Sequence, residues 1–230
     1  MSEADDVRRA FARQQVRWRD VRFRSWMPGN LFVQQEGERA LIDLLRRNGF
    51  LPLGERKVLD VGCGPGKLLL RLLLLGGQAE NLVGIDLLEH EIDQARKLAP
   101  HLEFRVADAT ELPFDNAMFD LALAFTTFTS MRSDEARRNA ADEIRRVLRP
   151  GGALLWYDFW TNPRNRDVKP LGMKDIRRLF PGSQIDARRV TLAPPIARRL
   201  AGTSWLACAL LDALPFLRTH WLALIRPPAR

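Results

Sequence analysis

Short apolar runs alternate with helical stretches through the middle of the chain. Runs rich in Val, Leu, Ile and Phe predict buried strands at residues 58–61, 83–86, 102–109, 119–125 and 153–160. The leucine-rich segment 68–75 and the charged segment 134–148 predict helices between strands. Because strands and helices take turns over residues 55–160, we expect an α/β fold with a parallel sheet.

Residues 1–50, ahead of this core, are expected to form an N-terminal helical cap. Asp5 or Asp6 is suited to open a first helix, which the segment Pro28–Asn30 then breaks. Asn30 is a good N-cap for a second helix, and Asn48–Gly49 is expected to end it.

Residues 161–230 complete the predicted second domain, 51–230. A short helix is expected at 173–180, a strand at 184–192 and a last strand at 222–225. Leucines and aromatic residues recur at helical spacing over 194–217, so we expect a helical insertion before the last strand.

A glycine turn separates the first strand from the helix that follows it. Gly62, Gly64 and Gly66 allow a tight reversal and let backbone N–H groups approach a ligand closely. Asp86 ends the second strand, where its carboxylate can accept hydrogen bonds from ribose hydroxyls. This spacing is typical of a nucleotide-binding half-unit.

Asp60 stands just before the turn and changes which nucleotide is expected. Its negative charge would repel an anionic pyrophosphate, but it would attract a sulfonium donor that carries an ammonium group.

The segment Asp60–Gly66, Asp-Val-Gly-Cys-Gly-Pro-Gly, resembles the first motif of class I S-adenosylmethionine-dependent methyltransferases. Asp108, the loop 112–115 and the turn 148–152 are similar to later motifs of that family, in the same order. The resemblance covers about residues 55–160 and is greatest to the methyltransferase type 11, ubiquinone/menaquinone-biosynthesis-like branch. It implies a Rossmann-like, seven-stranded, mostly parallel sheet with helices on both faces. In that fold the last strand is antiparallel and lies between the fifth and sixth.

The same resemblance implies S-adenosyl-L-methionine as the methyl donor, S-adenosyl-L-homocysteine as the product, and no metal. Asp60 would face the donor's ammonium, Asp86 its ribose and Asp108 its adenine amino group. Asp60 at a helix start and Asp108 in a turn also have ordinary structural explanations. The remaining positions that the resemblance assigns to the donor are Gly62, Cys63, Gly64, Gly66, Leu87, Ala109 and Phe125.

The acceptor side is less well defined. Thr126 and Thr127 follow the fourth strand where the methyl group is expected, but neither is a strong base. Asp158 ends the fifth strand, and burial would raise its pKa toward a value useful for a general base. Its alternative is a carboxylate paired with Arg164 or Arg166.

The segment that contains Trp18 and Trp26 is one candidate lid over the acceptor, and the insertion 194–217 is another. A lid of this kind, aromatic and rich in arginine, would suit a hydrophobic acceptor that carries an anionic group. Residues expected to contact the substrate are Trp18, Arg22, Trp26 and Trp160.

Charge is distributed unevenly along the 230 residues. The formal net charge is +8, of which residues 160–230 carry +9 and residues 1–159 carry −1. A solvated arginine face explains this excess, and so does an anionic partner such as a lipid surface or RNA. Nucleic acid is the less favoured partner, because no Asn-Pro-Pro-Tyr or Pro-Cys motif follows the fourth strand.

The function expected from the sequence is direct, in-line methyl transfer to oxygen or carbon of a hydrophobic small-molecule or lipid-like acceptor. The alternatives are an RNA methyltransferase that uses the basic last third, and a cofactor-binding module that acts through a partner. Two cysteines, an acidic N-terminus without an apolar run, and no apolar stretch of spanning length favour a cytoplasmic protein. Peripheral membrane contact through 194–217 stays open, and the sequence does not indicate an oligomeric state.

Overall fold

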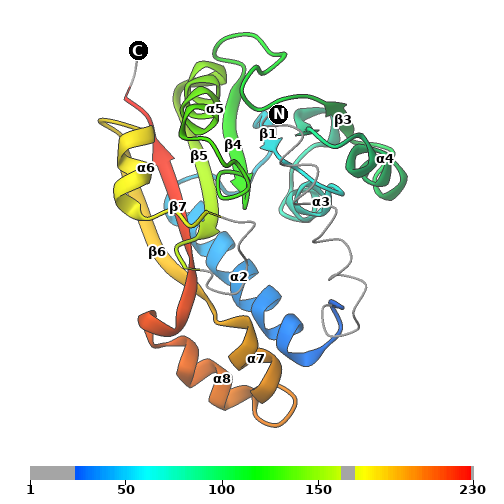
Figure 1. Cartoon of the computed structure of the whole chain (residues 1–230). Helices are drawn as coiled ribbons and strands as arrows, with labels where there is room; N and C mark the ends of the chain where they lie inside the picture. Colours follow the sequence, from blue (N-terminus) through cyan, green and yellow to red (C-terminus); the bar gives the residue numbers. More distant parts are fainter. Residues whose placement is uncertain (1–23, 162–168, 229–230) are drawn as a thin grey trace.

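The apolar runs form one seven-stranded sheet (Figure 1). The computed structural model describes residues 24–161 and 169–228 of the chain. The strands are β1 (Val58–Val61), β2 (Leu82–Asp86), β3 (Glu103–Val106), β4 (Phe119–Phe125), β5 (Leu148–Phe159), β6 (Gln184–Leu192) and β7 (Arg218–Arg226). Their order is β3-β2-β1-β4-β5-β7-β6, and β7 pairs antiparallel with both β5 and β6. The Rossmann-like fold expected from the resemblance is therefore confirmed.

Helices cover both faces of this sheet and bury its two apolar sides. One core contains side chains from α2 (Pro28–Arg47), α3 (Lys67–Leu74) and α4 (Glu89–Leu98). The other contains side chains from α5 (Asp134–Val147) and α6 (Met173–Leu179). A short 3₁₀ turn, Ala79–Asn81, leads into β2. Strand residues alternate between the two cores, so consecutive side chains of one strand have different surroundings.

The long helix α2 begins three residues earlier than the sequence predicts. Its N-cap is Met27 and its first residue is Pro28, whose fixed φ and missing N–H suit that position. Asn30, the predicted N-cap, lies inside the first turn and donates from its side chain to the Arg24 carbonyl at 2.8 Å. The end of the helix at Asn48, followed by Gly49 at φ +75°, is as predicted. The helix expected from Asp5 or Asp6 lies outside the described residues.

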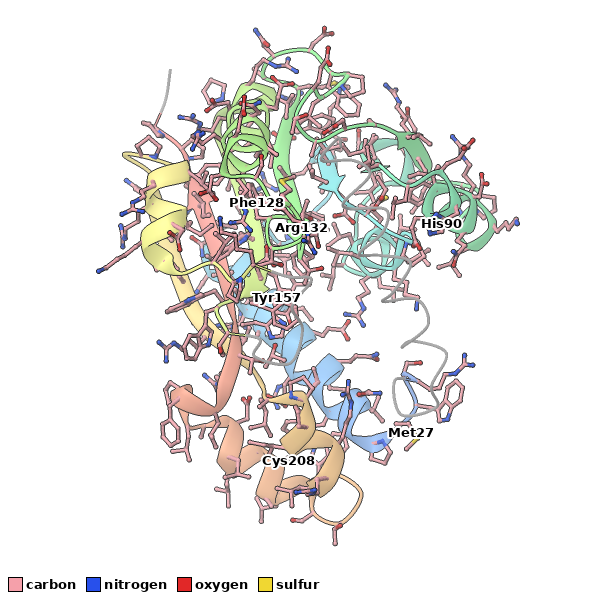
Figure 2. The ribbon with its side chains drawn as sticks, in the orientation of Figure 1. Met27, His90, Phe128, Arg132, Tyr157 and Cys208 are labelled. Atoms are coloured by element: carbon pink, nitrogen blue, oxygen red, sulfur yellow. The ribbon has the colours of Figure 1, made fainter. Side chains whose placement is uncertain are left out.

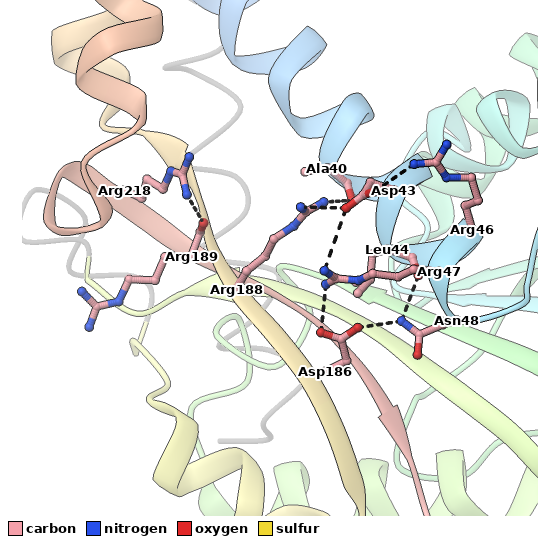
Figure 3. Close-up of polar contacts among 10 residues, drawn as sticks. All are labelled: Ala40, Asp43, Leu44, Arg46, Arg47, Asn48, Asp186, Arg188, Arg189 and Arg218. Atoms are coloured by element: carbon pink, nitrogen blue, oxygen red, sulfur yellow. Dashed lines mark hydrogen bonds and ion pairs between the residues drawn. The ribbon is translucent and has the colours of Figure 1, made fainter.

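Ion pairs attach the C-terminal half of α2 to β6 (Figure 3). Arg188 donates to Asp43 at 3.0 Å, and Arg47 donates to Asp186 at 2.8 Å. Asn48 donates to the second oxygen of Asp186 at 2.7 Å. One arginine of the basic last third is thus used inside the fold.

The insertion before β7 forms two helices, α7 (Pro194–Leu200) and α8 (Trp205–Asp212), and a 3₁₀ turn, Pro215–Leu217. The N-terminal end of α2 crosses α7 so closely that a Cβ on Gly29 would lie 2.3 Å from the Arg198 Cα. Phe32 is buried there and meets Trp205 edge to face, with ring centroids 5.2 Å apart. The helix α2 therefore joins the sheet to the insertion.

The outer side of the insertion is apolar. Leu206, Leu210 and Phe216 are each more than half exposed, at 69%, 64% and 67%. Within the described ranges, no helix is both long enough and apolar enough to cross a membrane. Membrane contact of this segment stays a prediction.

Candidate functional site

A cavity of about 550 Å³ opens at the carboxyl ends of β1, β2 and β4. The chain runs outward from β1 through β2 to β3 and then returns to β4 on the other side of β1. Open parallel sheets bind ligands at such a reversal, because the loops there diverge. Donor positions assigned from the sequence that line this cavity are Asp60, Gly62, Cys63, Gly64, Asp86, Leu87, Asp108, Ala109 and Phe125.

The glycine turn forms one wall of the cavity, and two of its glycines have no room for a Cβ. Gly62 has φ +74°, and a Cβ there would lie 2.7 Å from the Thr127 Oγ1. Gly66 has φ +76°, and a Cβ there would lie 2.6 Å from the Phe104 ring. Gly66 therefore lets α3 begin close against β3, but it does not line the cavity, although the sequence analysis assigned it to the donor.

Asp60 lies at this wall as a buried carboxyl group with an unsatisfied oxygen. Its side chain is 1% exposed, and its Oδ2 accepts no hydrogen bond from any described residue. Burial, together with the charge of nearby Asp86, raises the pKa of Asp60 to about 8. Buried polar atoms are nearly always satisfied in native proteins, so this oxygen is suited to receive a donor from a ligand.

Asp86 is held in a fixed orientation by the backbone. One oxygen accepts from the Gly64 N–H and the other from the Leu88 N–H, both at 2.9 Å. Burial raises the pKa of this carboxyl group. Each carboxylate oxygen has a second lone pair, so two neighbouring hydroxyl groups can still donate to it.

Asp108 has the turn role that the sequence left open, and it also lines the cavity. Its Oδ1 accepts from the Thr110 N–H and from the Thr110 hydroxyl, both at 2.8 Å, which shapes the turn after β3. The same residue lines the cavity beside Ala109. Its predicted contact with adenine stays a prediction.

The loop after β4 closes the cavity on its other side. Thr126 adopts φ +58°, and its N–H donates to the Tyr157 carbonyl at 2.7 Å. The Thr127 hydroxyl donates to the Val61 carbonyl at 2.7 Å, and the Thr126 hydroxyl donates to the Phe125 carbonyl at the same distance. Both threonines line the cavity, with their hydroxyl protons directed to backbone oxygens.

Asp158 requires a correction. It is fully buried and does not line the cavity; it accepts from the Trp156 indole N–H at 3.2 Å and from the Thr129 N–H at 3.3 Å. The Thr129 hydroxyl bonds its other oxygen. Burial raises its pKa to about 7, as expected, but the alternation along β5 turns this carboxyl group away from the site. We therefore assign Asp158 to holding the β4 loop and not to catalysis.

The predicted substrate contacts also change. Trp18 and Arg22 lie outside the described residues. Trp26 is 67% exposed, and Trp160 donates to the Arg218 carbonyl at 2.7 Å; neither lines the cavity. The sequence prediction took the segment that contains Trp18 and Trp26 as a lid, but it could not tell which way the side chains point.

Several cavity residues were missed from the sequence. Lys67 and Leu68 follow the glycine turn directly, and Glu135 and Asn139 come from the start of α5. Lys67 was detectable, because a residue that begins the helix after such a turn stands at the same edge as the turn. The α5 residues carry no local signal.

A second cavity of about 270 Å³ adjoins the first, between α2 and the sheet. The two cavities share Lys67, Leu68 and Phe125 in their linings. Tyr157, which lies near the centre of the molecule in Figure 2, lines the second cavity from β5.

Comparison with known proteins agrees with this geometry. A family model described as a methyltransferase domain matches residues 58–152. The chain is 37% identical over 133 residues to an O-methyltransferase of Pyrenophora dematioidea, covering 55% of this chain and 47% of that protein. It is 34% identical over 137 residues to the 27-O-demethylrifamycin SV methyltransferase of Amycolatopsis mediterranei, covering 56% and 47%.

The matched region spans about half the length of these curated relatives. Among solved structures, the [4+2]-cyclase SpnF superposes with a TM-score of 0.61 at 21% identity, covering 86% of this chain and 84% of that one. That likeness shows the fold alone.

The residues at the site fit the donor that the family implies. A buried carboxyl oxygen without a hydrogen-bond partner suits an ammonium, and a carboxylate oriented by two backbone N–H groups suits ribose hydroxyls. No cluster of three or more metal-ligating side chains occurs in the part of the chain that the structure covers. From the motif, the fold and the matched family model, we conclude that the region around residues 58–152 is a class I S-adenosylmethionine-dependent methyltransferase domain.

Proposed function

We propose that this protein transfers a methyl group from S-adenosylmethionine to an oxygen atom of a small organic acceptor. The unsatisfied, buried Oδ2 of Asp60 in the larger cavity is the observation that carries the proposal. The names of two relatives, an O-methyltransferase and a 27-O-demethylrifamycin SV methyltransferase, favour oxygen over carbon as the acceptor atom. When bound, S-adenosylmethionine supplies a methyl group already activated by the sulfonium.

The protein's part is then chiefly positioning. Asp60 would hold the ammonium of the donor, Asp86 its ribose and Asp108 its adenine. Fixing two reactants in line and excluding water contributes about 7–11 kcal/mol to lowering a barrier, so a strong base is not required. Of the described carboxyl groups at this cavity, only Glu135, at the start of α5, has no predicted part in holding the donor.

Two rival functions have less support. Binding of RNA by the basic last third competes with internal uses of its arginines, since Arg188, Arg218 and Arg226 all make contacts within the protein. A module without activity would still bind the donor. Fold alone does not separate these cases.

Calorimetry with S-adenosylhomocysteine tests the donor site. At pH 7 a carboxyl group with a pKa of about 8 is protonated, and an ammonium beside it favours ionisation. Binding of the product should therefore release up to about one proton, measured by titration in two buffers of different ionisation enthalpy. Asp60→Asn should abolish this release. Equal proton release in both proteins would contradict the role of Asp60.

Asp86→Ala should weaken product binding about 10- to 100-fold, because hydrogen bonds to a charged group are lost. Asp93→Ala on the exposed side of α4 is the matched control and should bind normally. Methyl transfer from labelled donor to a panel of hydroxylated aromatic compounds tests the reaction itself. Product binding without any transfer would favour the inactive module, and steeply salt-dependent RNA binding would favour the RNA alternative.

A further inference from the structure

The smaller cavity is placed to receive whatever molecule accepts the methyl group. It lies beside the donor cavity, and Leu68, Phe125 and Lys67 belong to both linings. An occupant of the smaller cavity would therefore meet the donor across these shared residues.

The floor and walls of this cavity are mainly apolar and aromatic. Phe125 stacks on Tyr157 with ring centroids 5.1 Å apart, and Tyr157 stacks on His220 at 4.6 Å and 8°. The Tyr157 hydroxyl is paired with the Thr191 hydroxyl at 2.8 Å, so the ring presents its apolar body to the cavity. Such a surface suits a flat, apolar molecule.

Two cations stand on the α3 wall of the same cavity. Arg71 is half-buried and Lys67 is exposed; neither forms an ion pair or side-chain hydrogen bond within the described residues. No Asp or Glu contributes to the described lining. Several other half-buried arginines in the described residues pair with carboxylates, as Arg188 and Arg218 do, or donate to other oxygens, as Arg56 and Arg226 do. The guanidinium of Arg71 has no such partner there. It favours an anionic group on the occupant.

Gly37 faces the cavity from the middle of α2. A Cβ at this position would meet nothing within 4 Å, and glycine is unfavourable inside a helix. The missing side chain therefore enlarges the cavity between α2 and the sheet.

We propose that this smaller cavity is the acceptor site, and that the acceptor is a flat, apolar molecule with an anionic group. Arg71 would bind that group, together with Lys67 where the two cavities meet. This inference rests on the proposed function, since it names the substrate class for the same reaction. The apolar body would pack on Phe125 and Tyr157, and the charge would lie toward α3.

The test uses two fluorescent probes of similar shape, with the full chain saturated with S-adenosylhomocysteine. The anionic probe is 8-anilinonaphthalene-1-sulfonate, and the neutral probe is N-phenyl-1-naphthylamine. Arg71→Gln should weaken binding of the sulfonate about tenfold, the loss expected for a charged hydrogen-bonding partner, and should leave the neutral probe unchanged. Gly37→Leu should weaken both probes by filling the cavity.

Gly202→Leu is the matched control, because Gly202 lies between α7 and α8 with equally open space and lines neither cavity. It should change neither affinity. The proposal is overturned if the sulfonate does not bind, or if Arg71→Gln and Gly37→Leu bind it as the unaltered protein does. It is also overturned if Arg71→Gln weakens S-adenosylhomocysteine as much as the sulfonate, because Arg71 would then serve the donor.

Calorimetry with S-adenosylhomocysteine separates this proposal from the previous one. Normal product binding with unchanged probe binding in the variants would refute the acceptor site alone. Absent product binding would refute the proposed function.

Discussion

At the residue scale, Gly66 shows a position where the fold requires that no side chain be present. Its φ of +76° is a conformation that other residues adopt only with strain, and the Phe104 ring occupies the space that a Cβ would need. The Phe104 ring lies on β3, which α3, β2 and α4 separate from the turn along the chain. The sequence identified the glycine by its motif, but not the aromatic ring that excludes every other residue.

Gly66→Ala should destabilise the protein by about 2–4 kcal/mol, because both the backbone strain and the clash must be relieved. Gly37→Ala is the opposite case, since it has open space around it in α2 and should stabilise by up to about 1 kcal/mol. Urea unfolding of both variants measures the difference. Equal stability of the two would contradict the assigned packing.

The candidate site was predictable where the chain itself fixes the geometry. Asp60 and Asp86 end strands that pair in register, so their positions at one edge follow from parallel pairing. The direction of the Asp158 side chain could not be predicted from the sequence. The residue at which the alternation along β5 begins decides which face of the sheet each side chain occupies. The exposed position of Trp26 could not be predicted either, since a lid depends on packing between distant segments.

At the scale of elements, β4 and β5 are joined at their carboxyl ends by one buried carboxyl group. Asp158 on β5 accepts hydrogen bonds from the backbone and side chain of Thr129, which follows β4. The Trp156 indole adds a third. The loop that carries Thr126 and Thr127 therefore depends on Asp158 for its shape.

Asp158→Ala should destabilise the protein by about 3 kcal/mol or more, because three buried donors lose their acceptor. Asp93→Ala, exposed on α4, should change stability by less than about 0.5 kcal/mol. Denaturant unfolding and product binding are measured together. A stable Asp158→Ala variant that binds product but has lost turnover would restore the catalytic assignment.

Most elements were predictable from period and composition, including the strand at 184–192 and the helices of the insertion. The start of α2 was not, because Asn30 and Pro28 both favour helix starts and the sequence prediction gave priority to the asparagine. The close packing of Gly29 against α7 favours the helix start that is observed. This contact joins segments almost 170 residues apart in the chain.

At the scale of the whole molecule, the excess of positive charge in the last third is partly structural. Arg226 donates to the Asn48 side chain at 2.7 Å, and Arg218 pairs with Asp212 at 2.9 Å. Arg189 lies 4.3 Å from the centre of the Trp160 ring. Composition alone could not show this, because these partners are set by the fold.

Buried carboxyl groups predict how the stability of the whole ligand-free protein changes with pH. The folded-state pKa of Asp60 is about 8, against 3.8 for an ordinary aspartate, so between these values the folded state holds a proton that the unfolded state has lost. Stability must then fall as pH rises, and Asp158 adds to the fall up to about pH 7.

His220 acts in the opposite direction below pH 6.5, because burial lowers its pKa from 6.5 to about 3. Between pH 6.5 and 8, the effect of Asp60 on stability is therefore not opposed by His220. Over this range, the free energy of unfolding should fall by up to about 1.4 kcal/mol per pH unit for Asp60 alone. Urea unfolding across this range should show that the free energy of unfolding of Asp60→Asn depends less on pH than that of the unaltered protein. A rise in the stability of the unaltered protein from pH 6.5 to 8 would contradict the pKa shift of Asp60.

The insertion α7–α8 connects two strands that are already hydrogen-bonded neighbours, with Leu192 of β6 opposite Arg218 of β7. Its two ends are consequently held about one strand spacing apart, near 4.8 Å, whatever the length of chain between them. Since the entropy of closing a loop grows only with the logarithm of its length, this junction can tolerate longer or shorter segments at small thermodynamic cost. Changes in length here would alter the support beneath the N-terminal end of α2 while leaving the donor-binding edge of the sheet untouched.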